Sequence, residues 1–219
     1  MNLYVENLLN LAECFEKAIF NNVKYPWDAL PRIKTFLLEF SKNLPGEFEQ
    51  IDQYIWVGKG TTIEKSALIK GPAIIGRNCE IRQGAYIREN VLLGDGVVIG
   101  NSTELKNSLL FNKAQVPHFN YVGDSILGFK AHLGAGVICS NLKSNGEIVR
   151  VKVGADYIET NLRKFGAIVG DHAEVGCNSV LNPGTVIGRN SIVYPLTPVR
   201  GFVPDNHILK STGELVPKR

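Results

Sequence analysis

The sequence predicts a mainly β protein built as a parallel β-helix, and two hydrophobic patterns carry this prediction. Aliphatic or aromatic residues occupy every sixth position from Val57 to Phe111, and the same period returns from Val169 to Val193. A second, mostly smaller residue follows each of these anchors by four positions. Neither the helical period of 3.6 nor the strand period of 2 persists over such a length, whereas a hexapeptide repeat is the sequence signature of a β-helix.

The period of six has a geometric reason. Each hexad supplies one short strand and one corner, so three hexads close a triangular coil of about 18 residues. The anchors point inward and stack about 4.8 Å apart, which is the spacing of hydrogen-bonded strands. Glycine directly follows many anchors, for example Gly76 and Gly94, where we expect tight or positive-φ backbone geometry.

Composition narrows the class of protein. The chain has 219 residues, 44% of them hydrophobic, and a formal net charge of +3, which is too small to indicate nucleic-acid binding. No apolar run reaches the ~20 residues of a membrane span, and the N-terminus lacks a signal-peptide pattern, so we expect a cytoplasmic protein. The four cysteines form no C-x-x-C pair, and Cys79 and Cys139 fall at inward repeat positions, which predicts reduced structural thiols.

The predicted organisation has three parts. Residues 1–50 carry apolar residues at helical spacing and predict two helices, which we expect to form a cap on the first coil or on a neighbouring subunit. Residues 51–200 form the β-helix, with a polar excursion loop and a short hairpin at 141–164. Residues 201–219 form a tail that wraps the last coil or reaches another subunit. Within the coils, Gln115–Tyr121 contains Pro117 and predicts an irregular break.

Three cations fall one coil apart. Lys70, Arg88 and Lys106 each follow an anchor directly and are separated by 18 positions, so they stack on adjacent strands. Like charges about 5 Å apart are unfavourable unless an anion is bound between them. A phosphate group fits such an array, and a solvated column of splayed side chains is the alternative.

His118 lies in the predicted break, close to Tyr121 and 12 residues beyond Lys106. A histidine can serve simply as a packed structural residue. Its place in an irregular segment beside a cationic column instead favours a catalytic base, because imidazole accepts protons near neutral pH.

These residues form part of a longer motif that resembles a known family. The motif reads Arg88, then Glu104-Leu105-Lys106, then His118-Phe119-Asn120-Tyr121-Val122-Gly123-Asp124, then Gly134-Ala135-Gly136 and a late Asn141. It is similar to the acetyltransferase half of the bifunctional UDP-N-acetylglucosamine-synthesising enzyme, over roughly residues 57–195. Stand-alone β-helix proteins described as pyrophosphorylase-related look similar as well.

The resemblance implies a left-handed β-helix that forms a homotrimer, with active sites between subunits. It implies transfer of an acetyl group from acetyl-CoA to the amine of an amino-sugar 1-phosphate, with no metal required. His118 would be the general base, and the acceptor and its phosphate would contact Arg88, Lys106, Tyr121, His132 and Lys164. Acetyl-CoA would contact Ala135, Asn141 and Cys177, and a main-chain N–H near Ala135 would stabilise the oxyanion.

The chain departs from the family pattern at three points. The family has asparagine at the position of His132 and serine at that of Cys177, so His132 leaves the identity of the acceptor open. Residues 1–50 contain no glycine-rich phosphate loop ahead of a strand, so the sequence supports no nucleotidyltransferase activity.

Two alternatives to the acetyltransferase stay open at this point. One is a non-catalytic module that binds a sugar phosphate or nucleotide sugar, or a partner subunit of a separate nucleotidyltransferase. The other is a zinc lyase on the same fold, which needs three converging histidines. The four histidines are 14, 40 and 35 positions apart, without the close pair that such a site uses.

Overall fold

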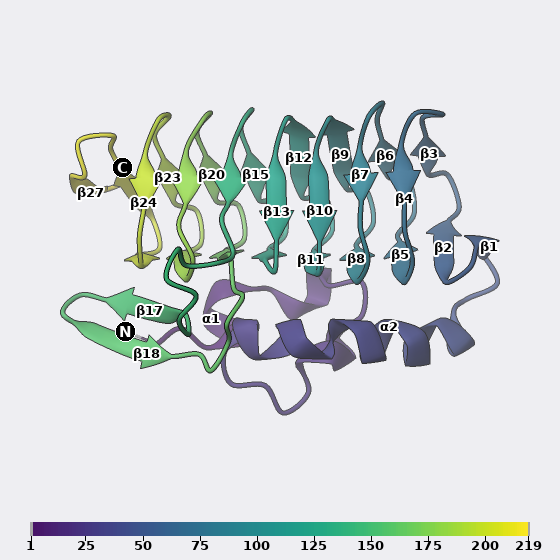
Figure 1. Ribbon diagram of the computed structural model, residues 1–219, viewed down its shortest axis with the longest axis horizontal. Helices are drawn as coiled ribbons and strands as arrows, with labels where there is room; N and C mark the ends of the chain where they lie inside the picture. Colours follow the sequence, from purple (N-terminus) through teal and green to yellow (C-terminus); the bar gives the residue numbers. More distant parts are fainter. Residues whose placement is uncertain (1, 219) are drawn as a thin grey trace.

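The computed structural model describes residues 2–218 and shows a parallel β-helix with three flat sides (Figure 1). Each side is a sheet, named here sheet A, sheet B and sheet C. The chain passes from A to B to C in each coil, and the β-helix is left-handed, as predicted. Seven coils are complete, because sheet C has seven strands.

The strands are short. Sheet A contains β1 (Phe48–Asp52), β2 (Ile55–Gly58), β5 (Ala73–Ile75), β8 (Val91–Leu93), β11 (Ser108–Leu110), β14 (Ile126–Leu127), β19 (Ala167–Val169), β22 (Thr185–Ile187) and β25 (Phe202–Val203). Sheet B contains β3 (Thr62–Ile63), β6 (Glu80–Ile81), β9 (Val98–Asn101), β12 (Gln115–His118), β15 (His132–Leu133), β20 (Glu174–Val175), β23 (Ile192–Val193), β26 (His207–Leu209) and β27 (Leu215–Pro217). Sheet C contains β4 (Leu68–Ile69), β7 (Tyr86–Ile87), β10 (Glu104–Lys106), β13 (Tyr121–Gly123), β16 (Ile138–Cys139), β21 (Val180–Leu181) and β24 (Pro198–Val199).

The anchors fill the interior, as the repeat predicted, with one exception. Ile87 and Leu105 are fully buried and stack in register, whereas the next inward residue on sheet A is Leu110. Phe111 instead points outward and packs in a second apolar cluster. The corner after Lys106 is one residue shorter than in the first coils, and the positive-φ residue moves forward accordingly, to Asn107. Counting in sixes misses this shift because Leu110 and Phe111 are both apolar.

The predicted break at Gln115–Tyr121 is wrong. Gln115 to His118 form β12, which pairs with β9 and β15, and Tyr121 begins β13. Pro117 is tolerated because its carbonyl side lies over Gly100, where an added Cβ would meet the Pro117 oxygen at 1.5 Å. The departures from the six-residue period are instead two shorter corners, one after Lys106 and one after Gly123.

The glycines after anchors serve close stacking and not positive φ. A Cβ on Gly76 would lie 2.4 Å from the carbonyl oxygen of Gly94 in the next coil. The left-handed conformation belongs to corner residues two or three places after an anchor, among them Asn78 (φ 53°) and Gly96 (φ 67°). Asparagine and glycine tolerate this conformation best.

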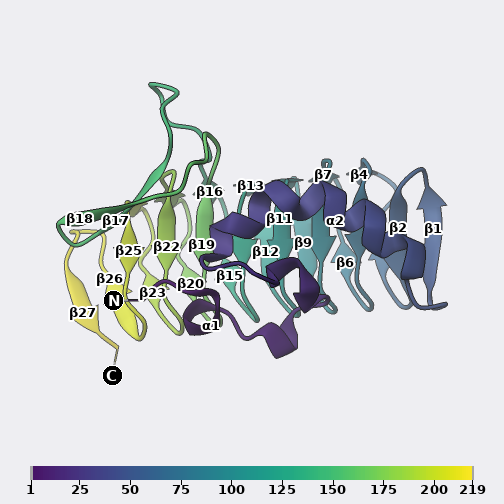
Figure 2. The same cartoon turned by 90° about the horizontal axis from the view of Figure 1, so that it is seen from below.

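The N-terminal segment lies along sheet A and does not cap the first coil. It contains α1 (Val5–Leu8), η1 (Leu11–Glu13), η2 (Lys17–Phe20), η3 (Pro26–Arg32), α2 (Ile33–Phe40) and η4 (Ser41–Asn43). Figure 2 shows α2 running parallel to the axis across the strands of sheet A. At the open end of the first coil, β1 pairs antiparallel with β2 and covers that edge of sheet A.

Outward apolar residues on sheet A explain this placement. They form one cluster with the helices, whose buried members include Trp27, Leu30, Ile33 and Leu37 on the helices and Ile74, Leu92, Leu109, Ile126, Ile168 and Val186 on the sheet. The first helix is shorter than predicted. Asn10 holds the chain extended, because its N–H donates to Asp171 (2.7 Å) and its side chain accepts from Ala12 N–H (3.1 Å).

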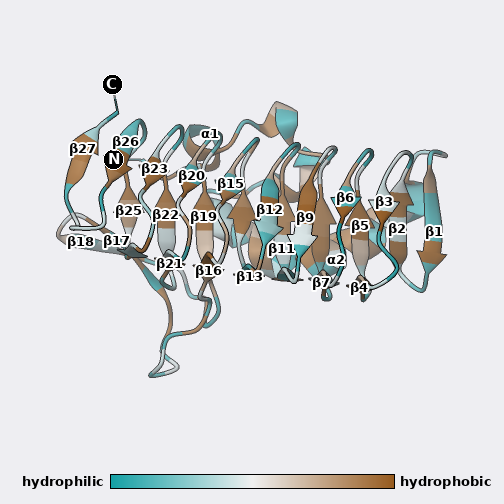
Figure 3. Cartoon of the chain, turned by 90° about the horizontal axis from the view of Figure 1, so that it is seen from above, coloured by the Kyte–Doolittle hydropathy of each residue, from teal (hydrophilic) through white to brown (hydrophobic). Residues whose placement is uncertain are grey.

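The excursion loop contains the predicted hairpin. Strands β17 (Arg150–Val153) and β18 (Asp156–Glu159) pair antiparallel. After residue 199 the coils continue through β25 and β26, and β27 folds back antiparallel on β26, where a wrapping tail had been expected. In Figure 3 most strands of the coils are coloured hydrophobic, while many corners are hydrophilic.

All four cysteines are free, which agrees with the prediction of structural thiols for the two inward ones. Burial raises the pKa of Cys79 to about 11 and that of Cys139 to about 12. Between residues 2 and 218, no helix combines the length and the apolar character that crossing a membrane requires.

Candidate active site

The outward side of sheet C carries the predicted cations. The register pairs Ile69 with Ile87, and Ile87 with Leu105. Lys70, Arg88 and Lys106 each follow one of these anchors, so they form a column along the coil axis, as predicted. A second outward column, one residue earlier in each strand, contains Tyr86, Glu104 and Tyr121.

Carboxylates relieve the repulsion within the cation column. Arg88 Nη1 lies 3.1 Å from Glu104 Oε1, and Arg88 Nε lies 3.6 Å from Glu89 Oε2. The ammonium of Lys70 lies 5.4 Å from the centre of the Tyr86 ring. Lys106 makes no ion pair within residues 2–218, so it is the cation of this column best placed to meet an anionic ligand.

The Tyr121 side chain passes over Gly123, which has no Cβ, and its hydroxyl lies near the side-chain amide of Asn141. A Cβ on Gly123 would lie 2.6 Å from the Tyr121 hydroxyl oxygen and 2.7 Å from Asn141 Nδ2. Asn141 donates to buried Asp124, which also accepts from Asn107 Nδ2 at 2.8 Å. Burial raises the pKa of Tyr121, and the carboxylates of Glu104 and Asp124 raise it further. At neutral pH Tyr121 is therefore a hydrogen-bond donor, which suits a phosphate oxygen.

His118 is the last residue of β12, at the corner between sheets B and C. Buried Asn120 holds this corner from inside: its Oδ1 accepts from His118 N–H (3.0 Å), and its Nδ2 donates to the Gly134 carbonyl (2.8 Å). The His118 carbonyl accepts from Gly136 N–H at 3.0 Å. The main chain is thus fixed on both sides, while the imidazole is exposed on the surface.

Ala135 and Cys177 occupy, in the next two coils, the corner position that His118 occupies in its own coil. The chain of main-chain bonds runs from Gly136 N–H to the His118 carbonyl and from Asn178 N–H to the Ala135 carbonyl, 3.0 and 2.8 Å long. Ala135 N–H makes no hydrogen bond within residues 2–218 and is available to a ligand. The structure therefore brings His118, Ala135 and Cys177 into one line, which we name the corner column.

The remaining predicted site residues lie elsewhere. His132 points outward from sheet B, where its Nδ1 lies 2.7 Å from Glu174 Oε2. Asn141 follows β16 at the edge of sheet C away from the corner column, and its side-chain amide lies near the Tyr121 hydroxyl, whereas the Tyr121 main chain begins β13 next to that corner. Lys164 is exposed at the end of the excursion loop, where it bridges to Leu142. Within one chain, His118, Tyr121 and Lys106 thus come from adjacent strands around one corner, whereas His132 lies on sheet B and Lys164 in the excursion loop.

Three residues of this site received no role in the sequence analysis: Glu104, Asp124 and Asn120. Glu104 was visible as an outward residue one place before an anchor, in the column of Tyr121. Asp124 and Asn120 act through hydrogen bonds across coils, which no local pattern reveals. Among residues 2–218, no group of three histidine, cysteine, aspartate or glutamate side chains is placed to hold a metal ion.

Comparison with known proteins places this motif in context. The family model of the GMPPB C-terminal domain matches residues 69–161. A bifunctional protein GlmU of Methanococcus maripaludis is 33% identical over 180 residues, which cover 81% of this chain and 44% of that protein. A bifunctional sugar-1-phosphate nucleotidylyltransferase/acetyltransferase of Sulfurisphaera tokodaii is 36% identical over 92 residues, covering 42% of this chain and 23% of that protein.

The chain is similar to the bifunctional GlmU proteins. The resemblance predicted from the motif is thereby confirmed, and the match lies in the C-terminal region of GlmU. The chain spans less than half the length of these curated relatives.

Two solved structures are also similar to this chain. One is a variant of perosamine N-acetyltransferase from Caulobacter crescentus in complex with CoA and GDP-perosamine, with a TM-score of 0.45, 19% identity and coverage of 71% of this chain and 56% of that chain. The other is a variant of AntD, an N-acyltransferase from Bacillus cereus, in complex with dTDP and coenzyme A, with a TM-score of 0.45, 20% identity and coverage of 79% and 90%.

Proposed function

We propose that the chain is an acetyl-CoA-dependent N-acetyltransferase that acts on an amino-sugar 1-phosphate of the glucosamine-1-phosphate type. The observation that carries the proposal is the corner column: a fixed, exposed His118 stands in line with the free N–H of Ala135, beside a sheet face that holds Lys106 and Tyr121. A base, an oxyanion donor and a phosphate site are the three elements that amine acetylation requires.

The chemistry balances with these groups. His118 accepts a proton from the sugar ammonium, and the freed amine attacks the thioester carbonyl of acetyl-CoA. The N–C bond forms, and the oxyanion of the tetrahedral intermediate accepts a hydrogen bond from Ala135 N–H. The C–S bond then breaks, the proton on His118 passes to the departing sulfur, and the nitrogen releases its remaining excess proton to solvent, giving the amide, CoA and one H⁺.

Association into a homotrimer, with the active site between subunits, belongs to the same proposal. The corner beside the site exposes large apolar side chains, with Phe119 at 61% and Leu196 at 70% of their full accessibility. Helices cover sheet A, whereas the outward faces of sheets B and C carry exposed Tyr194 and Val180. A neighbouring chain on these faces would bury this surface and bring its own sheet C opposite the corner column.

The proposal assigns acetyl transfer alone to this chain. The helices before β1 pack on sheet A, and residues 2–50 offer no glycine-rich loop for a nucleotide phosphate. Formation of a nucleotide sugar would then need a nucleotidyltransferase activity from outside residues 2–218 that uses the acetylated product.

The test is turnover of acetyl-CoA, followed by release of free thiol, with a panel of amino-sugar 1-phosphates and their UDP-linked forms. We expect turnover with a sugar 1-phosphate, and a decrease of about 10²- to 10⁴-fold in kcat for His118→Ala, because a positioned general base contributes that much. The matched control is His172→Asn, which changes an exposed histidine at another corner and suits its φ of 56°.

Two outcomes would count against the proposal. Unchanged kcat in folded His118→Ala would exclude His118 as the base. Acetyl-CoA binding without transfer to any acceptor would favour the non-catalytic binding module. The contact of His132 Nδ1 with Glu174 Oε2, 2.7 Å long, supports this alternative, because it engages a residue predicted to contact the acceptor.

A further inference from the structure

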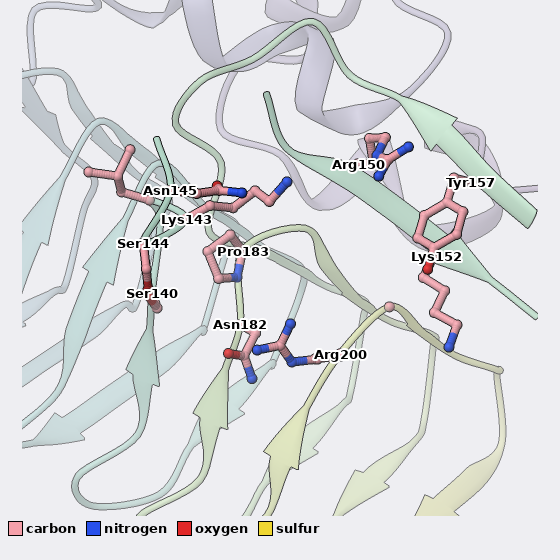
Figure 4. Close-up of a pocket in the computed structure, with 12 residues that line it drawn as sticks. Ser140, Lys143, Ser144, Asn145, Arg150, Lys152, Tyr157, Asn182, Pro183 and Arg200 are labelled. Carbon is pink, nitrogen blue, oxygen red and sulfur yellow. The ribbon is translucent and has the colours of Figure 1, made fainter. Parts of the chain in front are cut away.

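A cleft lies between the excursion hairpin and the last coils. It has a volume of about 680 Å³, and twelve residues line it. Figure 4 shows Arg150, Lys152 and Tyr157 on the hairpin side of the cleft, and Asn182 and Arg200 on the side of the coils. This volume falls within the range of small-molecule sites, about 300–1,000 Å³.

The lining is strongly basic. It includes four cations, Lys143, Arg150, Lys152 and Arg200, and no carboxylate. The whole chain has 24 cations against 21 acidic residues, so this is a local excess. Lys143 and Arg150 pair with Glu147 and Glu159 at 3.3 and 3.8 Å, on carboxylates that are largely exposed. Lys152 and Arg200 make no ion pair within residues 2–218.

The hairpin is built to hold its cations over the cleft. Burial alternates along β17 and the residue before it: Val149 and Val151 are fully buried, and Arg150 and Lys152 are exposed and line the cleft. Strand β17 packs closely against the coils at Gly184 and Gly201. A Cβ on Gly184 would lie 2.7 Å from the Arg150 carbonyl oxygen, and one on Gly201 would lie 2.5 Å from the Lys152 carbonyl oxygen.

An aromatic ring completes the cleft. Tyr157 lies opposite Lys152 in the hairpin, is 53% exposed, and has the Arg150 guanidinium 4.9 Å from its ring centre. Cations with fixed spacing bind phosphates, and an exposed ring offers a surface for stacking a flat base. A nucleotide combines both features.

The cleft also lies in line with the candidate active site. Ser140, Asn182 and Arg200 continue the outward column of Arg88 and Lys106 along sheet C. Arg200 is four coils beyond Lys106, which corresponds to about 19 Å at the usual strand spacing. A nucleotide bound in the cleft can therefore extend toward the reacting groups.

We propose that this basic cleft binds the diphosphate of a nucleotide, with Lys152 and Arg200 as its main phosphate ligands and Tyr157 against the base. Two sources share this chemistry: the phosphorylated ADP end of a CoA thioester, and a nucleoside-diphosphate sugar. The choice between these two sources rests on the proposed function, whereas nucleotide binding in the cleft does not.

The experiment measures binding without turnover. Isothermal titration calorimetry with CoA, 4′-phosphopantetheine and UDP is run on the wild type and on a Lys152→Ala/Arg200→Ala double variant. The control, Lys34→Ala/Lys42→Ala, removes the same charge from exposed positions on the helical side. Both changes are at exposed residues, and thermal unfolding confirms that each variant is folded.

We expect the cleft variant to lose about 10- to 100-fold in affinity for one nucleotide, because charge-assisted hydrogen bonds to phosphate are lost. The control should stay within about twofold of the wild type. A loss for CoA with unchanged binding of 4′-phosphopantetheine and UDP identifies the CoA source, and a loss for UDP alone identifies the nucleotide sugar.

Equal affinities of the cleft variant and the wild type for CoA and UDP would overturn the proposal, as would a wild type that binds neither. The proposed function fails separately: a wild type that binds nucleotide through the cleft but transfers no acetyl group would contradict acetyl transfer and leave the cleft assignment standing.

Discussion

Sheets A and C are built from the same repeat and share one interior, yet their outward faces differ completely. On sheet A the outward residues Ile74 and Leu92 are at most 2% exposed beneath the helices. On sheet C the outward residues include Arg88, Glu104 and Tyr121, which are polar and half-exposed. Inward residues therefore determine the scaffold, while the outward residues that alternate with them decide whether a face is covered or binds ligands.

The strongest test of this difference uses two isoleucines of one coil. Ile126 precedes anchor Leu127 on sheet A and is fully buried, and Ile138 precedes anchor Cys139 on sheet C and is partly exposed. We expect Ile126→Ala to lower the free energy of unfolding by about 2–5 kcal/mol, because it leaves a cavity beneath the helices. Ile138→Ala should change it by less than about 1 kcal/mol.

Urea unfolding at one protein concentration measures both changes. Comparable losses for the two variants would mean that sheet C is covered as tightly as sheet A in solution. That result would contradict the distinction between a packed and a ligand-binding face.

Two cysteines provide the next test. Cys14 belongs to the layer over sheet A, and burial raises its pKa to about 12. Cys177 is exposed in the corner column. Because the thiolate is the reactive form, we expect a disulfide reagent at neutral pH to modify Cys177 at least about 10²-fold faster than Cys14.

Labelling followed by peptide mass spectrometry identifies the modified residue, and Cys177→Ser should remove the fast phase. Saturating acetyl-CoA should also slow the labelling of Cys177, since the proposed function places the co-substrate along the corner column. Fast labelling of Cys14 in the folded protein would show that the helical layer opens readily.

Much of the scaffold could be predicted because it is encoded locally. The six-residue period revealed the coils and the stacking of Arg88 on Lys106, and alternation after Asn145 revealed the hairpin. The placement of the helices could not be read from the same count. The signal was present in pairs such as Ile74-Ile75, where an outward apolar residue precedes each anchor, but only a partner far away in the sequence explains it.

The candidate site likewise has a part that could be predicted from the sequence and a part that could not. The cation column follows from the repeat, so Lys70, Arg88 and Lys106 could be aligned by counting. His118, Ala135 and Cys177 came from the family resemblance, and only the strand pairing aligns them, because they are 17 and 42 positions apart. The basic cleft could not be predicted either, because Lys143, Lys152 and Arg200 come together only when the hairpin docks on glycines 184 and 201. The ion pair of Arg88 with Glu104 depends on side-chain conformation, which a repeat does not specify.

The smallest expected effect concerns the ionisation of Tyr121. Burial raises its pKa, with a further contribution from Glu104 on the same face. Since the folded state holds this proton more tightly than the unfolded state, the stabilisation is complete below the ordinary tyrosine pKa of about 10 and is lost as the pH rises through the folded value. We therefore expect the free energy of unfolding to fall above about pH 10, and to fall less steeply in Tyr121→Phe.

Ultraviolet difference titration of wild type against Tyr121→Phe isolates this one hydroxyl. Glu104→Gln should lower the pKa of Tyr121, because a neighbouring negative charge is removed, whereas Glu174→Gln on sheet B removes an equal charge from a different face and should leave it unchanged. If both glutamate variants shift Tyr121 equally, the effect would come from the net charge of the protein. A shift confined to Glu104→Gln would show that the polar face of sheet C acts as one electrostatic unit, in contrast to the apolar face of sheet A.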